Sequence, residues 1–469
     1  MATFFVDSTG VVTTASVDSD SIFIQSAALK GGTILGEAGA DTINFLEGAA
    51  TDASAVGVVV RGAGGNDSIT ISALLAFSAG NHSIYGGAGD DTIKVSGGST
   101  IGSLKSNEGN DFVTLSGAGT YSAIGLADGA DTIQMEQGSI KSINLGNGHD
   151  TFTALAGTYL TASTINFGKG NDTVSISASG SSAAVINAGD GKDSVDIQTL
   201  EDASTFKGGG GSDTINISGD VTTSQFIAGN GGADLISMSG ASDGLTLAGG
   251  AGNDTIELED NINGISAMVI GGSGDDSIYF TNIVEDDDYS AISVVGGAGA
   301  DSITFSAGTD VGSGETLGTL VYSSFSDSDL AATDVVTVDG AGISGNTTEL
   351  NIDYGVDLTS TTVGEGSAQV LLSDSTFSGN IASNIVTLSG DYLVSSVTAV
   401  AGTVDTLTFS AGANASVIFS VAGGTEYLFV QGGSSGTSDD SIINLGDLSG
   451  GGALALGGSA AVVTFSGQA

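Results

Sequence analysis

The chain has 469 residues, with 8 Lys and Arg against 54 Asp and Glu, 77 Gly, and no Pro, Cys or Trp. Its formal net charge of −46 argues against binding to nucleic acid or to an anionic membrane surface, and the lack of Cys excludes disulfides and thiolate metal sites. Hydrophobic residues make up 40% of the chain, so it is not a disordered acidic tail. Charge repulsion on this scale destabilises a compact state, and a divalent cation is the simplest source of the missing positive charge.

The N-terminal segment carries no targeting or membrane signal that the sequence reveals. It begins Met-Ala-Thr-Phe-Phe-Val-Asp, without a basic stretch or a long apolar run. No segment reaches the ~18 continuous apolar residues that a membrane helix needs. We therefore expect neither a cleaved N-terminal signal nor a membrane span.

A short block recurs along the first two thirds of the chain. It consists of Gly, any residue, Asp, a following residue that is usually Ser or Thr, an apolar residue, any residue and an apolar residue. Its Asp occurs thirteen times at intervals of 19 to 26 residues, and a copy without glycine precedes them at Asp20. Such regular spacing identifies an internal repeat. The thirteen motif aspartates are Asp41, Asp67, Asp91, Asp111, Asp131, Asp150, Asp172, Asp193, Asp213, Asp234, Asp254, Asp276 and Asp301.

Each repeat predicts two short strands and two turns. An alternating segment such as 92–95 follows the Asp, and a second one such as 143–145 leads into the next glycine-rich turn. A repeat of about twenty residues is too short for a strand–helix–strand unit, which needs ~30. It fits one coil of a solenoid, in which apolar residues such as Ile93 and Val95 stack from coil to coil into a continuous core. The absence of Pro agrees with this, because Pro would remove a hydrogen bond from a parallel ladder.

The glycine-rich turns are candidate calcium sites. Glycine permits turns that expose backbone carbonyls, and an Asp at the end supplies a hard oxygen. Calcium takes six to eight such oxygens, at 2.3–2.6 Å. The alternative is that each Asp only caps its own turn; thirteen stacked copies on a chain of charge −46 favour calcium. The complete pattern Gly-Gly-x-Gly-x-Asp occupies Gly86–Asp91, Gly208–Asp213, Gly249–Asp254, Gly271–Asp276 and Gly296–Asp301.

These turns resemble the nonapeptide of the repeats-in-toxin (RTX, hemolysin-type) family, Gly-Gly-x-Gly-x-Asp-x-apolar-x, over roughly residues 15–310. The resemblance implies an all-β fold, a right-handed parallel β-roll or β-helix with multiple Ca²⁺ between successive turns. It implies export by type I secretion with an uncleaved C-terminal signal, and folding in extracellular calcium. The implied ligands are the thirteen motif aspartates and turn carbonyls that include those of Gly86, Gly89, Gly208, Gly211, Gly249, Gly252, Gly271, Gly274, Gly296 and Gly299.

The chain departs from the family pattern in two respects. The period is near twenty rather than nine, with one motif per coil, which predicts one calcium column along a single edge and an ion-free opposite turn. The turns that end at Asp111, Asp131, Asp150 and Asp172 lack the paired glycines, so the ligand set there is less complete.

Two domains are expected. Residues 1–310 form the calcium-binding β-roll or β-helix, and residues 311–469 form a β-rich capping or assembly domain that contains the export signal. After residue 310 the motif fades to echoes such as Asp334–Val338, without the glycines or the even spacing. We favour a continuing or capping solenoid there, with a β-sandwich as the alternative.

No catalytic motif is convincing, so we do not expect an enzyme. Gly-x-Ser-x-Gly at 240–244 and at 432–436 lies outside any strand–helix elbow, and His82 and His149 lack a partner set. We expect a secreted structural surface protein that self-assembles as an S-layer or extracellular-matrix subunit at the cell surface. The alternatives are a calcium-dependent adhesin or carbohydrate-binding module with cell-surface polysaccharide as partner, an ice-binding protein, and a fragment with a polysaccharide-modifying role.

Overall fold

The computed structural model describes most residues up to 307 and the strand segments that follow. The described residues are 3–6, 13–14, 18–24, 32–45, 57–72, 82–96, 98, 100–160, 162–178, 183–198, 203–219, 225–239, 244–259, 267–283, 292–307, 315–321, 334–339, 347–353, 367–372, 375–382, 385–389, 416–420, 425–430, 441–447, 453–457 and 460–466. Every regular element among them is a β-strand, and none is a helix able to cross a membrane. The chain forms two compact units, 1–229 and 230–469, which are described separately.

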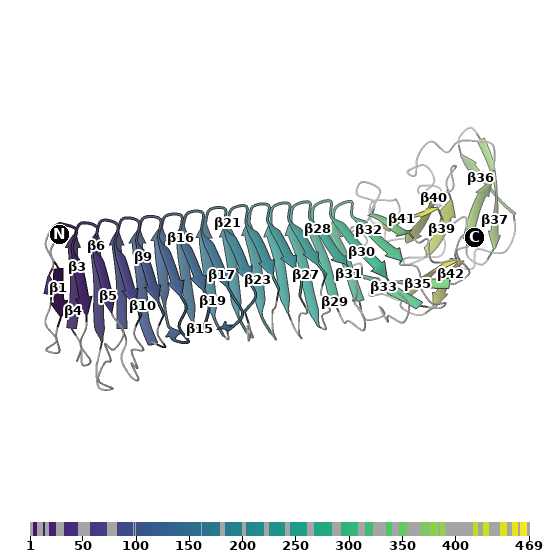
Figure 1. The fold of residues 1–469 in the computed structure, drawn as a ribbon. Helices are drawn as coiled ribbons and strands as arrows, with labels where there is room; N and C mark the ends of the chain where they lie inside the picture. The colour runs from purple at the N-terminus through teal and green to yellow at the C-terminus, as the bar shows by residue number, and fades with distance from the viewer. Residues whose placement is uncertain are drawn as a thin grey trace. The chain divides into compact units, whose positions relative to one another are not determined.

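In the first unit, one parallel sheet consists of the strands that follow the motif aspartates (Figure 1). Each strand pairs in register with its counterpart one coil later, so that Val113, for example, lies beside Ile133. The strands are β1 (Thr3–Val6), β3 (Ser21–Ile24), β5 (Thr42–Phe45), β7 (Ser68–Ile71), β9 (Thr92–Val95), β11 (Phe112–Leu115), β14 (Thr132–Met135), β17 (Thr151–Ala154), β20 (Thr173–Ile176), β22 (Ser194–Ile197) and β24 (Thr214–Ile217).

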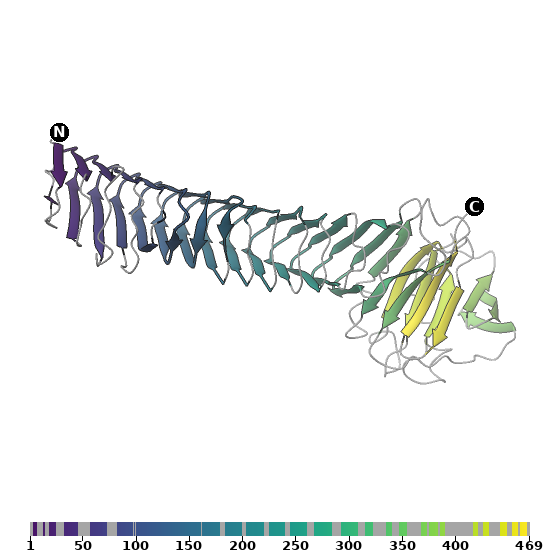
Figure 2. The ribbon, with the colours of Figure 1, turned by 60° about the horizontal axis from the view of Figure 1, so that its bottom comes forward.

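A second parallel set consists of the strands that lead into the glycine-rich turns. Successive members stack in chain order, as Figure 2 shows from a second direction. They are β2 (Thr13–Thr14), β4 (Gly32–Ala38), β6 (Val58–Gly64), β8 (His82–Ala88), β10 (Thr100–Glu108), β13 (Ile124–Asp128), β16 (Ser142–Asn147), β19 (Thr164–Lys169), β21 (Val185–Asp190) and β23 (Thr205–Gly210). Short strands β12 (Thr120–Tyr121), β15 (Gly138–Ile140) and β18 (Thr158–Tyr159) pair beside them, and β25 (Phe226–Gly231) spans the boundary at residue 229.

The second unit begins with the same arrangement. One parallel set is β26 (Leu235–Met238), β28 (Thr255–Glu259), β30 (Ser277–Ile283), β32 (Ser302–Ala307) and β34 (Asp334–Asp339), and the other is β27 (Leu245–Ala251), β29 (Ala267–Ser273), β31 (Ile292–Ala298), β33 (Glu315–Val321) and β35 (Thr347–Asp353). Pairing that is mainly antiparallel follows in β36 (Ser367–Leu372), β37 (Ser375–Ala382), β38 (Ile385–Ser389), β39 (Ser416–Ser420), β40 (Thr425–Val430), β41 (Ser441–Asp447), β42 (Ala453–Gly457) and β43 (Ala460–Ser466).

The interior of each coil is filled from both sets of strands. Alternate residues are buried, because successive side chains of a strand point to opposite faces. Phe152 of β17 meets Phe167 of β19 edge to face, with ring centroids 6.2 Å apart. Phe280 and Phe305, one coil apart in the second unit, stack with centroids 4.8 Å apart. The core is therefore a ladder of stacked apolar side chains.

The predicted all-β parallel solenoid is confirmed, with one glycine-rich turn per coil in the repeat region. Its right-handedness and the domain division at residue 310 stay predictions. Parallel pairing continues past residue 310 in the described strands β33, β34 and β35.

Ile93 and Lys94 in strand β9 provide a matched test of the ladder. Ile93 is fully buried, whereas Lys94 is exposed. We expect Ile93→Ala to lower the free energy of unfolding by about 2–5 kcal/mol, and Lys94→Ala to change it by less than about 0.5 kcal/mol. Chemical denaturation in calcium, followed by circular dichroism, measures both. Equal effects of the two changes would contradict the assignment of Ile93 to the core.

Candidate functional site

All thirteen motif aspartates lie at the inner side of the glycine-rich turns. Each immediately precedes a strand, and at most 2% of its surface is exposed. Asp20 and Asp334 occupy the same place at 1% and 0% exposure, so the sequence copy at Asp20 and the echo at Asp334 both belong to the series. The repeat thus extends by one coil before Asp41 and by one coil after Asp301.

In twelve of the thirteen motif aspartates, one carboxylate oxygen accepts a backbone N–H of the preceding coil. The backbone N–H of Asp41 donates to Oδ1 of Asp67 at 2.7 Å, and that of Asp254 donates to Oδ1 of Asp276 at 2.8 Å. Within unit 1 this bond recurs from Asp20 to Asp213, and within unit 2 from Asp234 to Asp334, always at 2.7–2.9 Å. The aspartates therefore cap a neighbouring coil's backbone, not that of their own turn.

The other carboxylate oxygen is buried without a hydrogen-bond donor. This holds for Oδ2 of ten motif aspartates: Asp41, Asp67, Asp91, Asp111, Asp131, Asp150, Asp172, Asp193, Asp254 and Asp276. Leaving a buried acceptor unsatisfied is costly, and more so for a charged one. A row of such oxygens within a well-bonded backbone is what a missing cation would leave behind.

A glycine leaves room for that cation beside Oδ2. We call the fifth residue before a motif Asp the pre-turn position. A Cβ placed on the pre-turn Gly36 would lie 2.5 Å from Oδ2 of Asp41 and 2.6 Å from the carbonyl oxygen of Gly62 in the next coil. The carboxylate oxygen and the carbonyl oxygen therefore converge beside the glycine, where one calcium ion can bind both. We call this oxygen-lined space the glycine cradle; Oδ2 of the turn's own Asp lines it at Gly36, Gly62, Gly86, Gly208, Gly249, Gly271 and Gly296.

The chemistry of the cradle fits calcium. Its donors are a carboxylate and a backbone carbonyl, both hard oxygens. Among the described residues, no group of three or more His, Cys, Asp and Glu side chains gathers at one point. Backbone carbonyls must therefore provide much of the coordination, and the nitrogen or sulfur ligands that zinc prefers are not part of the cradle.

The glycines expected as carbonyl ligands fall into two classes. Gly86, Gly208, Gly249, Gly271 and Gly296 are pre-turn residues that line cradles, whereas Gly89, Gly211, Gly252, Gly274 and Gly299 form the bend two residues before the Asp. Gly89 shows why the second class must be glycine: its φ is 119°, and a Cβ there would lie 2.5 Å from the carbonyl oxygen of Gly65. Their role as ligands stays a prediction.

Burial perturbs the carboxyl groups of the motif aspartates. It raises the pKa of Asp67 to about 6 and that of Asp91 to about 7; the negative charge of neighbouring aspartates adds to the rise, and the accepted backbone N–H opposes it. The same cause raises the pKa of Asp254 to about 6 and that of Asp276 to about 7. Without a cation, these carboxyl groups keep their proton to a higher pH than an ordinary aspartate does.

The calcium-free protein should be more stable at about pH 5 than at about pH 8. A carboxyl with a raised pKa in the folded state keeps a proton that the unfolded chain, with a pKa near 3.9, has released. Folding therefore binds protons between these values, and stability falls as the pH rises through the folded pKa. The β signal in far-UV circular dichroism, followed in chelator from about pH 5 to about pH 8, measures this loss. Asp91→Asn should make this loss less steep; a β signal that rises with pH would contradict this account.

A second ladder runs along the outside of the same turns and was not anticipated from the sequence. The side chain just before the motif Asp accepts the N–H of its counterpart in the next coil, as Asn66 does from Asp90 at 3.0 Å and Asp90 from Asn110 at 2.8 Å. His149 joins it by accepting the N–H of Asn171 through Nδ1 at 2.7 Å. The sequence does contain a signal for this ladder, because Asn or Asp often occupies the position just before the motif Asp, which otherwise varies.

His82 lies apart from these turns. It is buried in β8, where Nδ1 accepts the N–H of Val58 at 3.0 Å, and burial lowers its pKa to about 4. It therefore acts as a neutral acceptor in the stack of coils.

Comparison with known proteins identifies the repeat. The model of the RTX calcium-binding nonapeptide repeat matches in four copies, over residues 78–101, 246–261 and 293–311. No curated protein matches the chain. A crystal structure of a hyperactive, Ca²⁺-dependent, β-helical antifreeze protein from an Antarctic bacterium is similar, with 18% identity over 71% of this chain and 83% of that one and a TM-score of 0.38. The chain carries RTX calcium-binding nonapeptide repeats, a family whose repeats bind multiple calcium ions.

Proposed function

We propose that this protein is a secreted structural protein of the cell surface, which calcium stabilises and which self-assembles as an S-layer or extracellular-matrix subunit. The observation that carries the calcium part is the glycine cradle, where Oδ2 of a buried Asp and a carbonyl oxygen converge beside a glycine. Ions bound there add their binding free energy to the stability of the folded coils.

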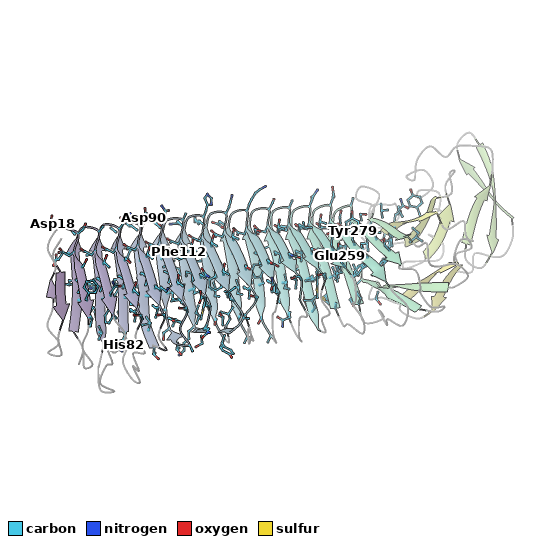
Figure 3. The ribbon with its side chains drawn as sticks, viewed as in Figure 1. Asp18, His82, Asp90, Phe112, Glu259 and Tyr279 are labelled. Carbon is cyan, nitrogen blue, oxygen red and sulfur yellow. The ribbon has the colours of Figure 1, made fainter. Side chains whose placement is uncertain are left out.

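The acidic edge of the turns supports the assembly part. We define this acidic edge as Glu37, Asp90, Glu108 and Asp128, exposed side chains of the glycine-rich turns in the first unit. Figure 3 shows Asp18 and Asp90 along this side of the coils. Like charges so arranged repel neighbouring molecules in chelator, and calcium between two such edges bridges them.

Electron microscopy of the purified protein tests the assembly. We expect sheets or filaments in millimolar calcium and dispersed particles in chelator. A variant with Glu37→Gln, Asp90→Asn, Glu108→Gln and Asp128→Asn should keep the circular dichroism spectrum of the parent and lose the assemblies, because only exposed carboxylates change. Dispersed parent protein in calcium would reject self-assembly while leaving the calcium-stabilised fold in place.

A second candidate, a binding module for polysaccharide or for ice, rests on a row of hydroxyls. Thr132, Thr151, Thr173, Ser194 and Thr214 occupy equivalent, outward-facing positions in five successive coils. A regular row of hydroxyls can meet a ligand that repeats its own hydroxyls at intervals. Glycan-array binding tests for a polysaccharide ligand, and thermal hysteresis tests for ice. Replacing Thr151, Thr173 and Ser194 by Lys should abolish whichever of the two activities the protein has.

A further inference from the structure

We propose that the first unit binds an acidic polysaccharide, one whose sugars carry carboxylate groups, along the outward face of the strands that lead into its glycine-rich turns. The site is the basic row, which we define as the outward residues that stand in register in eight successive coils, from Arg61 in β6 to Lys207 in β23. Such binding goes beyond the proposed assembly, since the calcium-folded coils present the row whether or not the chains associate.

Positive charge is concentrated in this row. Its eight residues include three of the eight Lys and Arg of the chain, Arg61, Lys105 and Lys207, and no Asp or Glu. The equivalent row on the other set of strands, which runs from β7 to β24, contains one cation, Lys94, and one acid, Asp196. On a chain of net charge −46, a face with cations and no acids favours an anionic ligand.

Arg61 and Lys105 form the carboxylate-binding end of the row. The Arg61 guanidinium lies over the ring of Tyr85, 4.3 Å from its centroid, and Lys105 stands beside Tyr85 on the next coil. Both cations are exposed, and neither forms an ion pair with a residue that the structure describes. Because the ring restrains the guanidinium, Arg61 loses less freedom when it forms paired hydrogen bonds with a carboxylate. Adjacent strands are about 4.8 Å apart, so the two cations suit carboxylates ~9–10 Å apart on one extended ligand.

Amide and hydroxyl groups continue the row in the later coils. Asn144, Asn166 and Asn187 follow one another in register, and Nδ2 of Asn187 donates to Oδ1 of Asn166 at 2.7 Å. Ser142 and Thr164 stand two residues earlier on the same strands and point outward beside them. Such groups both donate and accept hydrogen bonds, as sugar hydroxyls do. A regular row on the outside of a sheet suits an extended polymer, since small ligands bind in concave pockets.

Two other anionic partners fit the row less well. A nucleic acid would have its phosphates matched by only three cations and would be repelled by the rest of the chain. A second copy would have to place its acidic edge on the row, and that edge already has calcium as its proposed partner. The amides and hydroxyls favour a sugar polymer over both.

Isothermal titration calorimetry of the full chain in calcium tests this binding. The probe is a hyaluronan oligosaccharide, a sugar polymer with regularly spaced carboxylates, and the control is the same oligosaccharide with its carboxyl groups reduced to alcohols. We expect the probe to bind, with an affinity that falls as the salt concentration rises, and the control not to bind. No binding of the probe, or equal binding of both, would overturn the proposal. Either failure leaves the calcium-stabilised fold and the assembly, which microscopy measures, untouched.

Two charge reversals on different sets of strands locate the site. Lys105 lies in the basic row and Lys94 in the other set, and both are exposed in strands of neighbouring coils. Lys105→Glu should weaken the affinity by about tenfold or more, and Lys94→Glu by less than about threefold. Circular dichroism in calcium checks both folds, and Lys105→Gln with Lys94→Gln replaces the pair if either spectrum departs from the parent's. Equal weakening by the two reversals would overturn the assignment to this row.

Two further measurements separate the other partners. A single-stranded DNA oligonucleotide of equal charge that bound as tightly as hyaluronan would make the row a general polyanion site and overturn the proposal. Sedimentation in calcium tests the second copy: if Lys105→Glu dissolves the assemblies of the parent without changing the affinity for the oligosaccharide, the row binds another chain instead. Weaker binding of DNA and unchanged assembly support the polysaccharide.

Discussion

Removing calcium with a chelator is expected to unfold the coils that contain glycine cradles at neutral pH. Two causes act together: each buried Oδ2 loses its cation, and the net charge of −46 is left without counter-charge. An ion present at a hundred times its dissociation constant contributes about 2.7 kcal/mol, so losing several exceeds the 5–15 kcal/mol stability of a typical protein. Far-UV circular dichroism should show a large loss of β signal, recovered when calcium is restored.

Magnesium and sodium are the controls for this experiment. Magnesium carries the same charge but requires octahedral geometry at 2.0–2.1 Å and gives up water reluctantly, so it should restore little of the signal. Sodium at matched ionic strength screens exposed charges and tests the general electrostatic contribution. A spectrum and a thermal midpoint that do not change in chelator would contradict calcium-dependent folding.

Gly62→Ala is expected to remove one calcium ion and to lower the free energy of unfolding in calcium by about 3 kcal/mol. The added Cβ would clash with Asp67 Oδ2 and with the carbonyl oxygen of Gly86, which it would approach at 2.7 Å, and so would displace two oxygens that bind the ion. Ala188 shows that the backbone tolerates a methyl group at a pre-turn position. The loss should therefore come from the ion rather than from a broken turn.

Gly64→Ala is the matched control in the same turn. A Cβ at Gly64 meets no atom within 4 Å, and other turns carry Ala88, Ala251 and Ala298 at this place. Its calcium count and denaturation midpoint should equal those of the parent. In chelator, Gly62→Ala and Gly64→Ala should no longer differ by the contribution of an ion. Equal stability of the two variants in calcium would show that the cradle at Gly62 holds none.

The coil architecture was predictable because its causes are local and repeated. The spacing of the motif aspartates sets the coil length, and the alternation around Ile93 and Val95 sets the inward face. The strands that lead into the turns alternate in the same way, and there Leu145 and Phe167 are buried. Asp20 was recognised by its spacing and by the Ser and alternating apolar residues that follow it, despite its missing glycine.

The separate roles of the two oxygens of each motif carboxylate were not predictable. The motif spacing brings Asp41 and Asp67 together, but only the coordinates show that Oδ1 accepts a backbone N–H while Oδ2 faces the cradle. Asp334 continues the series although its glycines are gone, because its place is held by pairing with β32.

The most direct test is a crystal structure of the full chain grown in calcium, with the ions located by anomalous scattering. Peaks are expected in the cradles of pre-turn glycines, bonded to Oδ2 of residues such as Asp41, Asp254 and Asp276 and to glycyl carbonyl oxygens at 2.3–2.6 Å. Cradles without anomalous density in saturating calcium, with the turns still folded, would contradict the central claim that calcium is held at this edge.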